Sequence, residues 1–283
     1  MVDNFQTAQI FDLPGQACYG RGQPNSWLEN DMDVNQKVIA VTGAGRGLGR
    51  ALSLGLAAAG ARIALLERDG ESLEAAAREI ERSVPGAEEP LALACDVTDE
   101  AAVTGAVRAI DDRWGRIDAL VSNAGLMLPT EKLRLLNADI SDVRRVLDTN
   151  LVAGFNVTKA FAPVMIRGGG GRIIYMSSMI GVQAGLGLAP YGASKAGLNL
   201  LTNVAHRELA DQGIRTVALA PGLTDTPGMR GTVEDGYAER VASAYPGGRL
   251  GQPEDVIPFV RFLCSDASVH LSGTFLPIRP VTG

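Results

Sequence analysis

The sequence predicts an α/β protein with a single doubly wound domain, in which helices cover both faces of one parallel sheet. Short apolar runs alternate with longer segments rich in Ala, Leu and charged residues from about residue 35 to the C-terminus. Parallel strands need a crossover connection, which a helix usually provides, so strand–helix alternation favours a parallel sheet. A glycine-rich segment also follows the first apolar run, where such a domain turns from its first strand into its first helix.

The apolar runs predict about seven strands. Residues 38–41 form a short run rich in β-branched side chains, which is typical of a parallel strand buried on both faces. We expect strands at residues 37–42, 62–67, 91–95, 117–122, 171–177, 214–219 and 273–279.

Helical segments fill the intervals between these strands. The segment after the glycines is rich in Ala and Leu, which are strong helix formers. The clearest helices are expected at residues 48–59, 71–83, 99–113, 139–165, 191–211 and 253–265.

Length, composition and charge exclude several classes of protein. The 283 residues are 46% hydrophobic and 20% charged, as in an ordinary one-domain globular protein. A net charge of −6, with no basic run longer than Arg144-Arg145, argues against a nucleic-acid partner. No apolar stretch approaches the roughly 20 residues that span a bilayer, and residues 1–30 show no signal pattern. The widely spaced Cys18, Cys95 and Cys264 are typical of a reducing cytoplasm, and two histidines are too few for a zinc site with them, so no metal is expected.

The glycine-rich segment predicts a dinucleotide site in a Rossmann-type domain. Residues 37–49 read KVIAVTGAGRGLG, an apolar strand followed by glycines with the spacing TGxxxGxG. Glycines let backbone N–H groups approach a pyrophosphate at the positive end of the following helix. We therefore expect residues 35–283 to form a dinucleotide-binding and catalytic domain.

Residues 1–34 fall outside the strand–helix pattern and form an N-terminal extension. They hold Phe5, Ile10, Phe11 and Trp27 among several glycines and prolines. The extension is either a tail or an arm that packs on a neighbouring subunit through these side chains.

The most informative stretch, residues 178–195, combines Ser178, Tyr191 and Lys195. Tyr191 and Lys195 are four residues apart, so on a helix they share one face. An ammonium beside a phenol favours the phenolate, and we expect Lys195 to lower the pKa of Tyr191 towards neutrality. Such a phenol can exchange a proton with an alcohol or a ketone, while Ser178 holds the reacting oxygen. No GxSxG motif precedes a helix, which argues against a serine hydrolase.

Six motifs in order resemble the short-chain dehydrogenase/reductase family, from about residue 35 to the C-terminus. They are the glycine segment 42–49, Asp96 after the third strand, Asn123-Ala124-Gly125 after the fourth, Asn150 in a long helix, the Ser–Tyr–Lys set, and Pro221-Gly222 followed by Thr226. Ser122 replaces a second asparagine of many relatives, and the end of the chain lacks the usual acidic residue and paired glycines.

This resemblance implies a role for each matching residue. Tyr191 is the acid/base, Lys195 lowers its pKa and fixes the nicotinamide ribose, and Ser178 polarises the carbonyl. Asn150 positions a water of the proton relay, or alternatively has only a structural role. The implied cofactor-binding residues are Gly43, Arg46, Gly47, Leu48, Gly49, Glu67, Asp96, Val97, Asn123, Ala124, Gly125, Tyr191, Lys195, Pro221, Gly222 and Thr226. The resemblance also implies a homodimer or homotetramer.

Glu67 favours NAD over NADP. It ends the second strand eighteen residues after Gly49, where a carboxylate would accept hydrogen bonds from the adenosine ribose hydroxyls. A 2′-phosphate there would meet like charge, at a cost of about 4 kcal/mol per unit charge at 4 Å and an effective dielectric of 20. Arg46 and Arg68 favour NADP instead, so NADP stays open.

Apolar residues near the catalytic set predict an uncharged secondary alcohol or ketone with a hydrophobic body as the substrate. The expected substrate-binding residues are Ser178, Ile180, Gln183, Leu188, Tyr191 and Leu223. Further candidates are Leu126, Met127, Leu128, Val182, Ala184, Leu186, Met229, Tyr237 and Tyr245. Residues 224–248 are expected to form a lid over the substrate.

Two other functions stay open. An NADPH-dependent 3-oxoacyl-thioester reductase would share the fold and the catalytic residues, but basic residues should line its entrance, where the sequence offers little beyond Arg230. A non-catalytic dinucleotide-binding scaffold would be expected to lack Ser178, Tyr191 or Lys195, and all three are present.

Overall fold

Seven parallel strands form one sheet in the order β3-β2-β1-β4-β5-β6-β7. The computed structural model describes residues 32–280, so the expectations for residues 1–31, including the tail or arm, lie outside the described part. The strands are β1 (Val38–Thr42), β2 (Arg62–Glu67), β3 (Leu91–Ala94), β4 (Ala119–Ser122), β5 (Gly171–Met176), β6 (Ile214–Pro221) and β7 (Thr274–Ile278). Because β1 lies beside β4, the strand order reverses between them, and the crevice at their carboxyl ends is the usual ligand site of such a sheet.

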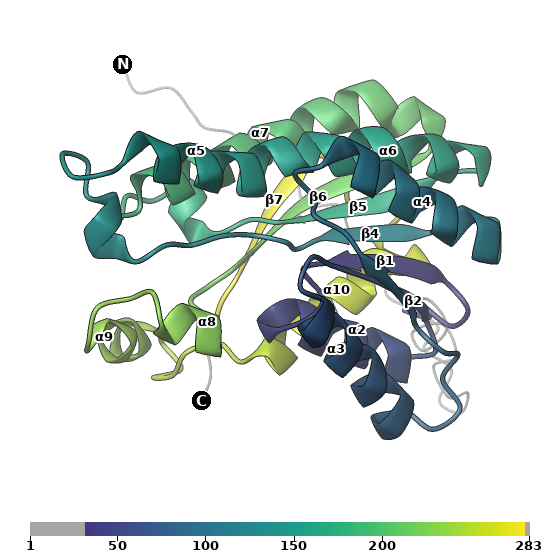
Figure 1. Cartoon of the computed structure of the whole chain (residues 1–283), viewed down its shortest axis with the longest axis horizontal. Coiled ribbons are helices and arrows are strands. Elements are labelled where there is room, and N and C mark those ends of the chain that lie inside the picture. Colours follow the sequence, from purple (N-terminus) through teal and green to yellow (C-terminus); the bar gives the residue numbers. More distant parts are fainter. Residues whose placement is uncertain (1–31, 281–283) are drawn as a thin grey trace, which may run out of the picture.

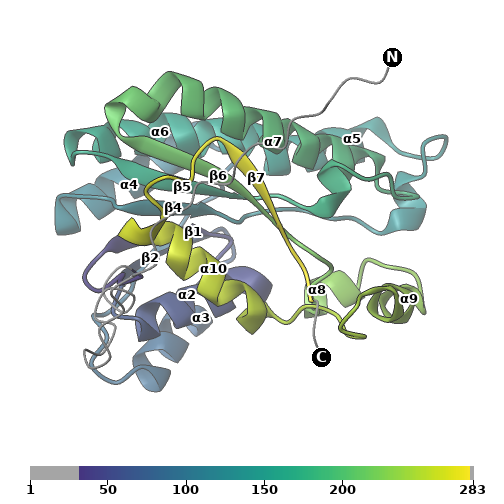
Figure 2. The same cartoon turned by 180° about the vertical axis from the view of Figure 1, so that it is seen from behind.

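Helices cover both faces of the sheet (Figures 1 and 2). One layer holds α4 (Glu100–Trp114), α5 (Ile140–Leu147), α6 (Ala153–Arg167) and α7 (Ala189–Leu209). The other holds α2 (Gly47–Ala58), α3 (Gly70–Ser83) and α10 (Pro253–Cys264). The short helices α8 (Pro227–Arg230) and α9 (Tyr237–Ala244) lie together beside the second layer, across from the α5 end of the first.

The predicted fold class and strand positions are confirmed. Every residue of β1 is buried, which explains its continuous apolar sequence, and its side chains alternate between two core clusters, one under each helical layer. Each Å² of apolar surface removed from water stabilises the fold by about 25 cal/mol. Burial of the strands therefore holds their ends in place.

The prediction of one continuous helix at residues 139–165 is wrong. The segment contains α5 and α6, joined by a π-helical turn, η2 (Asp148–Val152). The Asn150 amide in this turn binds the backbone of Leu126 in a different loop, which accounts for the interruption. The local sequence alone gives no sign of this tertiary contact.

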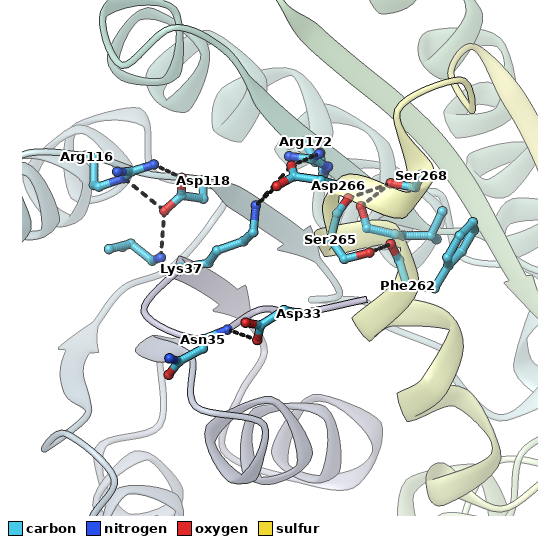
Figure 3. Close-up of polar contacts among 12 residues, drawn as sticks. Asp33, Asn35, Lys37, Arg116, Asp118, Arg172, Phe262, Ser265, Asp266 and Ser268 are labelled. Atoms are coloured by element: carbon cyan, nitrogen blue, oxygen red, sulfur yellow. Dashed lines mark hydrogen bonds and ion pairs between the residues drawn. The ribbon is translucent and has the colours of Figure 1, made fainter. Parts of the chain in front are cut away.

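A charged cluster lies at the amino ends of the strands, away from the carboxyl edge (Figure 3). Asp266, in the short turn η5 (Asp266–Ser268), accepts hydrogen bonds from Lys37 and, at 2.7 Å, from Arg172. Arg172 is 5% exposed and stands in register with Arg215 on the neighbouring strand. Burial alone would raise the pKa of Asp266, but Lys37 and Arg172 outweigh it and hold that pKa below its usual value. Asp266 thus neutralises cations that would otherwise repel each other.

We therefore expect Asp266→Asn to destabilise the fold by about 1–3 kcal/mol, because it leaves the buried Arg172 charge without its partner. This range is below the full cost of an unpaired buried charge, because the Asp266 side chain is 76% exposed and solvent screens its interactions. The fold lowers the pKa of Asp266, so its carboxylate contributes to the free energy of unfolding of the wild type above the unfolded-state pKa of this group. That contribution is lost as the pH falls through the folded-state pKa. Urea unfolding at pH 7 and at acid pH measures both effects. Asp211→Asn, at an exposed position, is the control. Equal unfolding midpoints for wild type and Asp266→Asn at pH 7 would remove Asp266 from this role.

No helix within residues 32–280 is long and apolar enough to cross a lipid bilayer. In the same part of the chain, no group of His, Cys, Asp and Glu side chains is arranged to hold a metal ion.

Candidate active site

A pocket of about 900 Å³ opens at the carboxyl edge of the sheet. Its lining comes from the segments that follow β1 through β6, and from α7, α8 and α9. All the residues predicted to be catalytic, cofactor-binding or substrate-binding line this pocket, except Gly47 and Asn150. The fold therefore brings together motifs that lie far apart in the sequence.

Ser178 and Tyr191 reach the pocket from two different elements. Ser178 follows β5 and caps the short turn η3 (Met179–Gly181), where its Oγ accepts a hydrogen bond from the Ile180 N–H at 3.2 Å. Tyr191 lies in the first turn of α7, which Pro190 helps to start. Burial raises the pKa of the Tyr191 phenol, and the Ser178 side chain opposes this increase without cancelling it.

Lys195 lies one turn after Tyr191 on α7, as predicted, with its Nζ 5.5 Å from the centre of the tyrosine ring. The ammonium donates a hydrogen bond to the Met176 carbonyl oxygen at 2.7 Å. Burial lowers the pKa of Lys195 to about 8.

The lowering of the Tyr191 pKa by Lys195 therefore stays a prediction. The ammonium is directed at a backbone carbonyl, and burial dominates the phenol and raises its pKa. The i, i+4 spacing predicts that the two side chains are neighbours, but it does not predict to which acceptor the ammonium donates its hydrogen bond.

Asn150 lies behind the pocket wall and is buried. Its Oδ1 accepts a hydrogen bond from the Leu126 N–H at 2.6 Å, and its Nδ2 donates to the Leu126 carbonyl oxygen at 2.9 Å and to Ser194 Oγ at 3.2 Å. These contacts join the segment after β4 to α7, the helix that carries Tyr191 and Lys195. They support a positioning role for Asn150, and its participation in a proton relay stays a prediction.

The glycine loop fits closely against the segment after β4. Gly43 has a positive φ of 64°, and a Cβ there would lie 2.9 Å from Ala124 Cα. A Cβ on Gly49 would lie 2.1 Å from the Gly43 carbonyl oxygen. Glycine is thus required at both positions, and α2 begins at the pocket with its N–H groups available for an anion. Gly47 lies outside the lining, beside Thr226.

Asn123 holds this loop in place. Its Nδ2 donates hydrogen bonds to the carbonyl oxygens of Thr42 and Gly43, at 3.0 and 3.3 Å. The Thr42 Oγ1 accepts in turn from the N–H groups of Asn123 and Ala124. The two predicted cofactor motifs therefore form one hydrogen-bonded unit.

Glu67 closes the other side of the glycine loop. Its carboxylate accepts hydrogen bonds from the N–H groups of Gly45 at 3.3 Å, Arg68 at 2.9 Å and Asp69 at 3.2 Å. The side chain is mostly buried but lines the pocket. Arg68 lies 4.0 Å from Asp96, so part of its charge is already balanced. Arg46 is exposed at the start of α2.

Comparisons with known proteins agree with this arrangement. The family model for short chain dehydrogenases matches residues 37–236. The chain is 36% identical over 247 residues to a 3-oxoacyl-[acyl-carrier-protein] reductase of Thermotoga maritima, a match that covers 87% of this chain and 98% of the relative. The corresponding Escherichia coli reductase is 32% identical, with coverage of 88% and 98%.

The chain belongs to the short-chain dehydrogenase family.

Solved structures of the family show the same fold. A 7α-hydroxysteroid dehydrogenase complexed with NADH and 7-oxoglycochenodeoxycholic acid superposes with a TM-score of 0.82 at 27% identity, covering 88% of this chain and 95% of that one. An NAD⁺-bound xylitol dehydrogenase gives a TM-score of 0.79 at 35% identity, with coverage of 87% and 98%. Like other members of the family, this dehydrogenase is an oxidoreductase that acts on CH–OH groups.

The dehydrogenase also has pocket residues that sequence reasoning missed. Three of them are charged: Arg134 from the segment after β4, Glu234 from the loop between α8 and α9, and Arg240 from α9. Two further apolar candidates, Leu128 and Val182, are not part of the lining. Helical spacing places Arg240 one turn after Tyr237, but nothing in the sequence shows that α9 faces the pocket.

Proposed function

We propose that this dehydrogenase transfers a hydride between NAD(H) and a secondary alcohol or ketone with a hydrophobic body. The observation that carries the proposal is one pocket that combines Ser178, Tyr191 and Lys195 with a glycine loop and Glu67. In the proposed substrate part, Ile180, Leu188 and Leu223 supply apolar walls. The neutral polar side chains of the lining there include Gln183, Thr130, Tyr237 and Tyr245.

In this proposal each residue of the catalytic set handles the substrate oxygen or its proton. Ser178 Oγ hydrogen-bonds the oxygen, and the Tyr191 hydroxyl gives a proton to the carbonyl in reduction or takes one from the alcohol in oxidation. Lys195, protonated below a pKa of about 8, supplies positive charge beside the phenol, and Asn150 fixes the segment that faces it. The nicotinamide supplies the hydride chemistry when bound.

Glu67 supports NAD as the cofactor. Its carboxylate is held at the end of β2 by three backbone N–H groups, so it cannot easily turn away from a ribose beside it. Gly43, Asn123 and the start of α2 are the groups that would hold the phosphates and the adjoining ribose. Asp96, Val97, Pro221, Gly222 and Thr226 complete the proposed cofactor wall.

Replacing Glu67 tests this choice. We expect the wild type to prefer NAD by at least about tenfold in kcat/KM, and Glu67→Ser to shift the NADP/NAD ratio by at least about tenfold, equivalent to about 1.4 kcal/mol. The substitution removes like charge next to a 2′-phosphate and frees Arg46 and Arg68 to meet it. Steady-state kinetics with both cofactors on both proteins measures the ratio. A wild-type preference for NADP would contradict the assignment.

An NADPH-dependent 3-oxoacyl-thioester reductase is the second candidate. Relatives at 32–36% identity are named 3-oxoacyl-[acyl-carrier-protein] reductases, and two arginines that the sequence did not single out, Arg134 and Arg240, line the pocket. Arg230, the basic residue expected from the sequence, does not line the pocket and pairs with Asp225. A non-catalytic scaffold is less well supported, because Ser178, Tyr191 and Lys195 share one pocket.

One experiment separates these functions. Binding of NADH and NADPH is first compared by fluorescence titration, and activity is then screened over cyclic, aromatic and aliphatic ketones and a 3-oxoacyl thioester. Turnover of hydrophobic ketones with NADH supports the first proposal, and turnover of the thioester with NADPH supports the second. Cofactor binding without turnover of any of these compounds would favour the scaffold.

A cytoplasmic location and assembly into a homodimer or homotetramer remain proposals. Cys95 and Cys264 are buried free thiols, and Cys18 lies outside the described residues. In the layer that contains α5 and α6, Ile140, Val152 and Phe155 are exposed apolar side chains, which suits contact with a second subunit. Size-exclusion chromatography with light scattering tests the assembly.

A further inference from the structure

The outer wall of the substrate pocket is positively charged. Arg134, Glu234 and Arg240 all line it, so this wall holds two guanidinium groups and only one carboxylate. Arg134 comes from the segment that leads to α5, and the other two come from the α8–α9 region, which lies across from that segment (Figure 1). An uncharged substrate would leave this net charge without a role.

Arg134 and Glu234 form a loose ion pair across the pocket. Arg134 Nη2 lies 3.3 Å from Glu234 Oε1, and the two side chains are 51% and 43% exposed. By contrast, Arg230 in the same region holds Asp225 with two hydrogen bonds of 2.6 and 2.7 Å. A single contact between half-exposed groups contributes little free energy. An anion that enters the pocket can therefore displace Glu234 from Arg134.

Arg240 has no carboxylate within ion-pair distance among residues 32–280. Its guanidinium lies over the ring of Tyr237, 5.8 Å from the ring centre, and both residues line the pocket. Stacking on an aromatic ring limits the freedom of the guanidinium and leaves its N–H groups able to form a bidentate bond with an anion.

We propose that the substrate carries an anionic group at the end of its apolar body, and that Arg240 binds this group together with Arg134. The inference rests on the proposed function for the reacting end, where Tyr191 meets the carbonyl, and it replaces the expectation of an uncharged substrate. The anion is either the carboxylate of a keto acid or a phosphate of the carrier arm of a thioester. Arg134, Glu234 and Arg240 then determine specificity, while Ser178, Tyr191 and Lys195 perform the reaction.

A binding measurement tests the proposal without requiring turnover. Octanoate and octanamide have the same apolar chain and differ in charge, and each is titrated calorimetrically into the protein saturated with its reduced cofactor. We expect octanoate to bind at least about tenfold more tightly than octanamide, and this preference to weaken as salt is added. Equal affinity for the two ligands would overturn the proposal, whatever the outcome of the activity screen.

Two substitutions should act in opposite directions. Arg240→Met should reduce octanoate affinity by about tenfold and octanamide affinity by less than about threefold. Glu234→Gln should increase octanoate affinity, because it frees Arg134 and removes a like charge. Arg240→Lys, which keeps the charge, should retain most of the preference, and Arg108→Met, at an exposed position on α4, is the control. A loss in Arg240→Met that is equal for both ligands would indicate only a structural role and would overturn the proposal.

The source of the anion is identified by kinetics with two pairs of ketones. One pair is an ω-carboxy methyl ketone and its methyl ester, and the other is a 3-oxoacyl thioester of coenzyme A and of N-acetylcysteamine, which lacks phosphate. Arg240→Met should lower kcat/KM selectively for the charged member of the pair that resembles the substrate. If no ketone reacts but the octanoate preference persists, the proposed reaction fails and the anion site stands. If both members of each reacting pair lose activity equally, the anion site fails and the reaction stands.

Discussion

Tyr191→Phe should lower kcat by at least about a hundredfold, because it removes the hydroxyl that exchanges a proton with the substrate oxygen. Cofactor affinity should remain nearly unchanged, since the ring and the α7 backbone stay in place. The remaining activity should also lose the pH dependence of the wild type, in which alcohol oxidation rises with pH and ketone reduction falls. The rise should lie on the alkaline side, because burial raises the pKa of Tyr191.

Tyr175→Phe is the matched control for this substitution. Tyr175 is a fully buried tyrosine of β5, and its hydroxyl bonds to Thr158, away from the pocket. Burial likewise raises its pKa, to about 12. Both variants lose a tyrosine hydroxyl, but only Tyr191→Phe should lose turnover. Retention of most activity by Tyr191→Phe, measured under conditions where chemistry limits the rate, would exclude Tyr191 as the acid/base.

Much of the fold could be predicted from the sequence because its signals are local. The apolar run of β1 marks a buried parallel strand, and the glycines at 43 and 49 mark a close turn that the structure requires. Strand–helix alternation then leaves few possible topologies, since crossover connections have one preferred hand. The pocket residues follow from this topology, because motifs at the carboxyl ends of neighbouring strands must meet at one edge.

The features that were missed depend on contacts between distant parts of the chain. The π-turn at Asn150 follows from its hydrogen bonds to Leu126, and the partner of Lys195 is a carbonyl of β5. Arg134 and Glu234 are a hundred residues apart. No periodicity or spacing encodes such pairs. The charged wall of the pocket therefore appears only when the chain is folded, and substrate specificity is the least predictable property of this dehydrogenase.

Lys195→Met should abolish most turnover and weaken cofactor binding, yet stabilise the folded protein at pH 7. Lys195 is 4% exposed, and burial lowers its pKa from 10.5 to about 8. A shift of this size is equivalent to about 3 kcal/mol against the charged form in the folded state. Methionine fills a similar volume without charge. It cannot donate the hydrogen bond to the Met176 carbonyl, and this loss reduces the stability gain by about 1 kcal/mol. We expect a net gain of about 1–2 kcal/mol in the free energy of unfolding.

The pH dependence of this gain identifies its cause. Because the folded-state pKa of Lys195 is depressed, the unfolded chain binds more protons between about pH 8 and 10.5, and the wild type gains stability as the pH rises through this range. The variant lacks this titration, so its advantage should be full below pH 8 and should shrink towards pH 10. Urea unfolding of both proteins at pH 7, 8.5 and 10 measures the difference between their free energies of unfolding. Groups that titrate equally in both proteins do not contribute to this difference. A variant that is less stable than the wild type at pH 7 would show that Lys195 stabilises the fold. In that case the Lys195 ammonium, which we propose takes part in the reaction beside Tyr191, would not destabilise the folded protein.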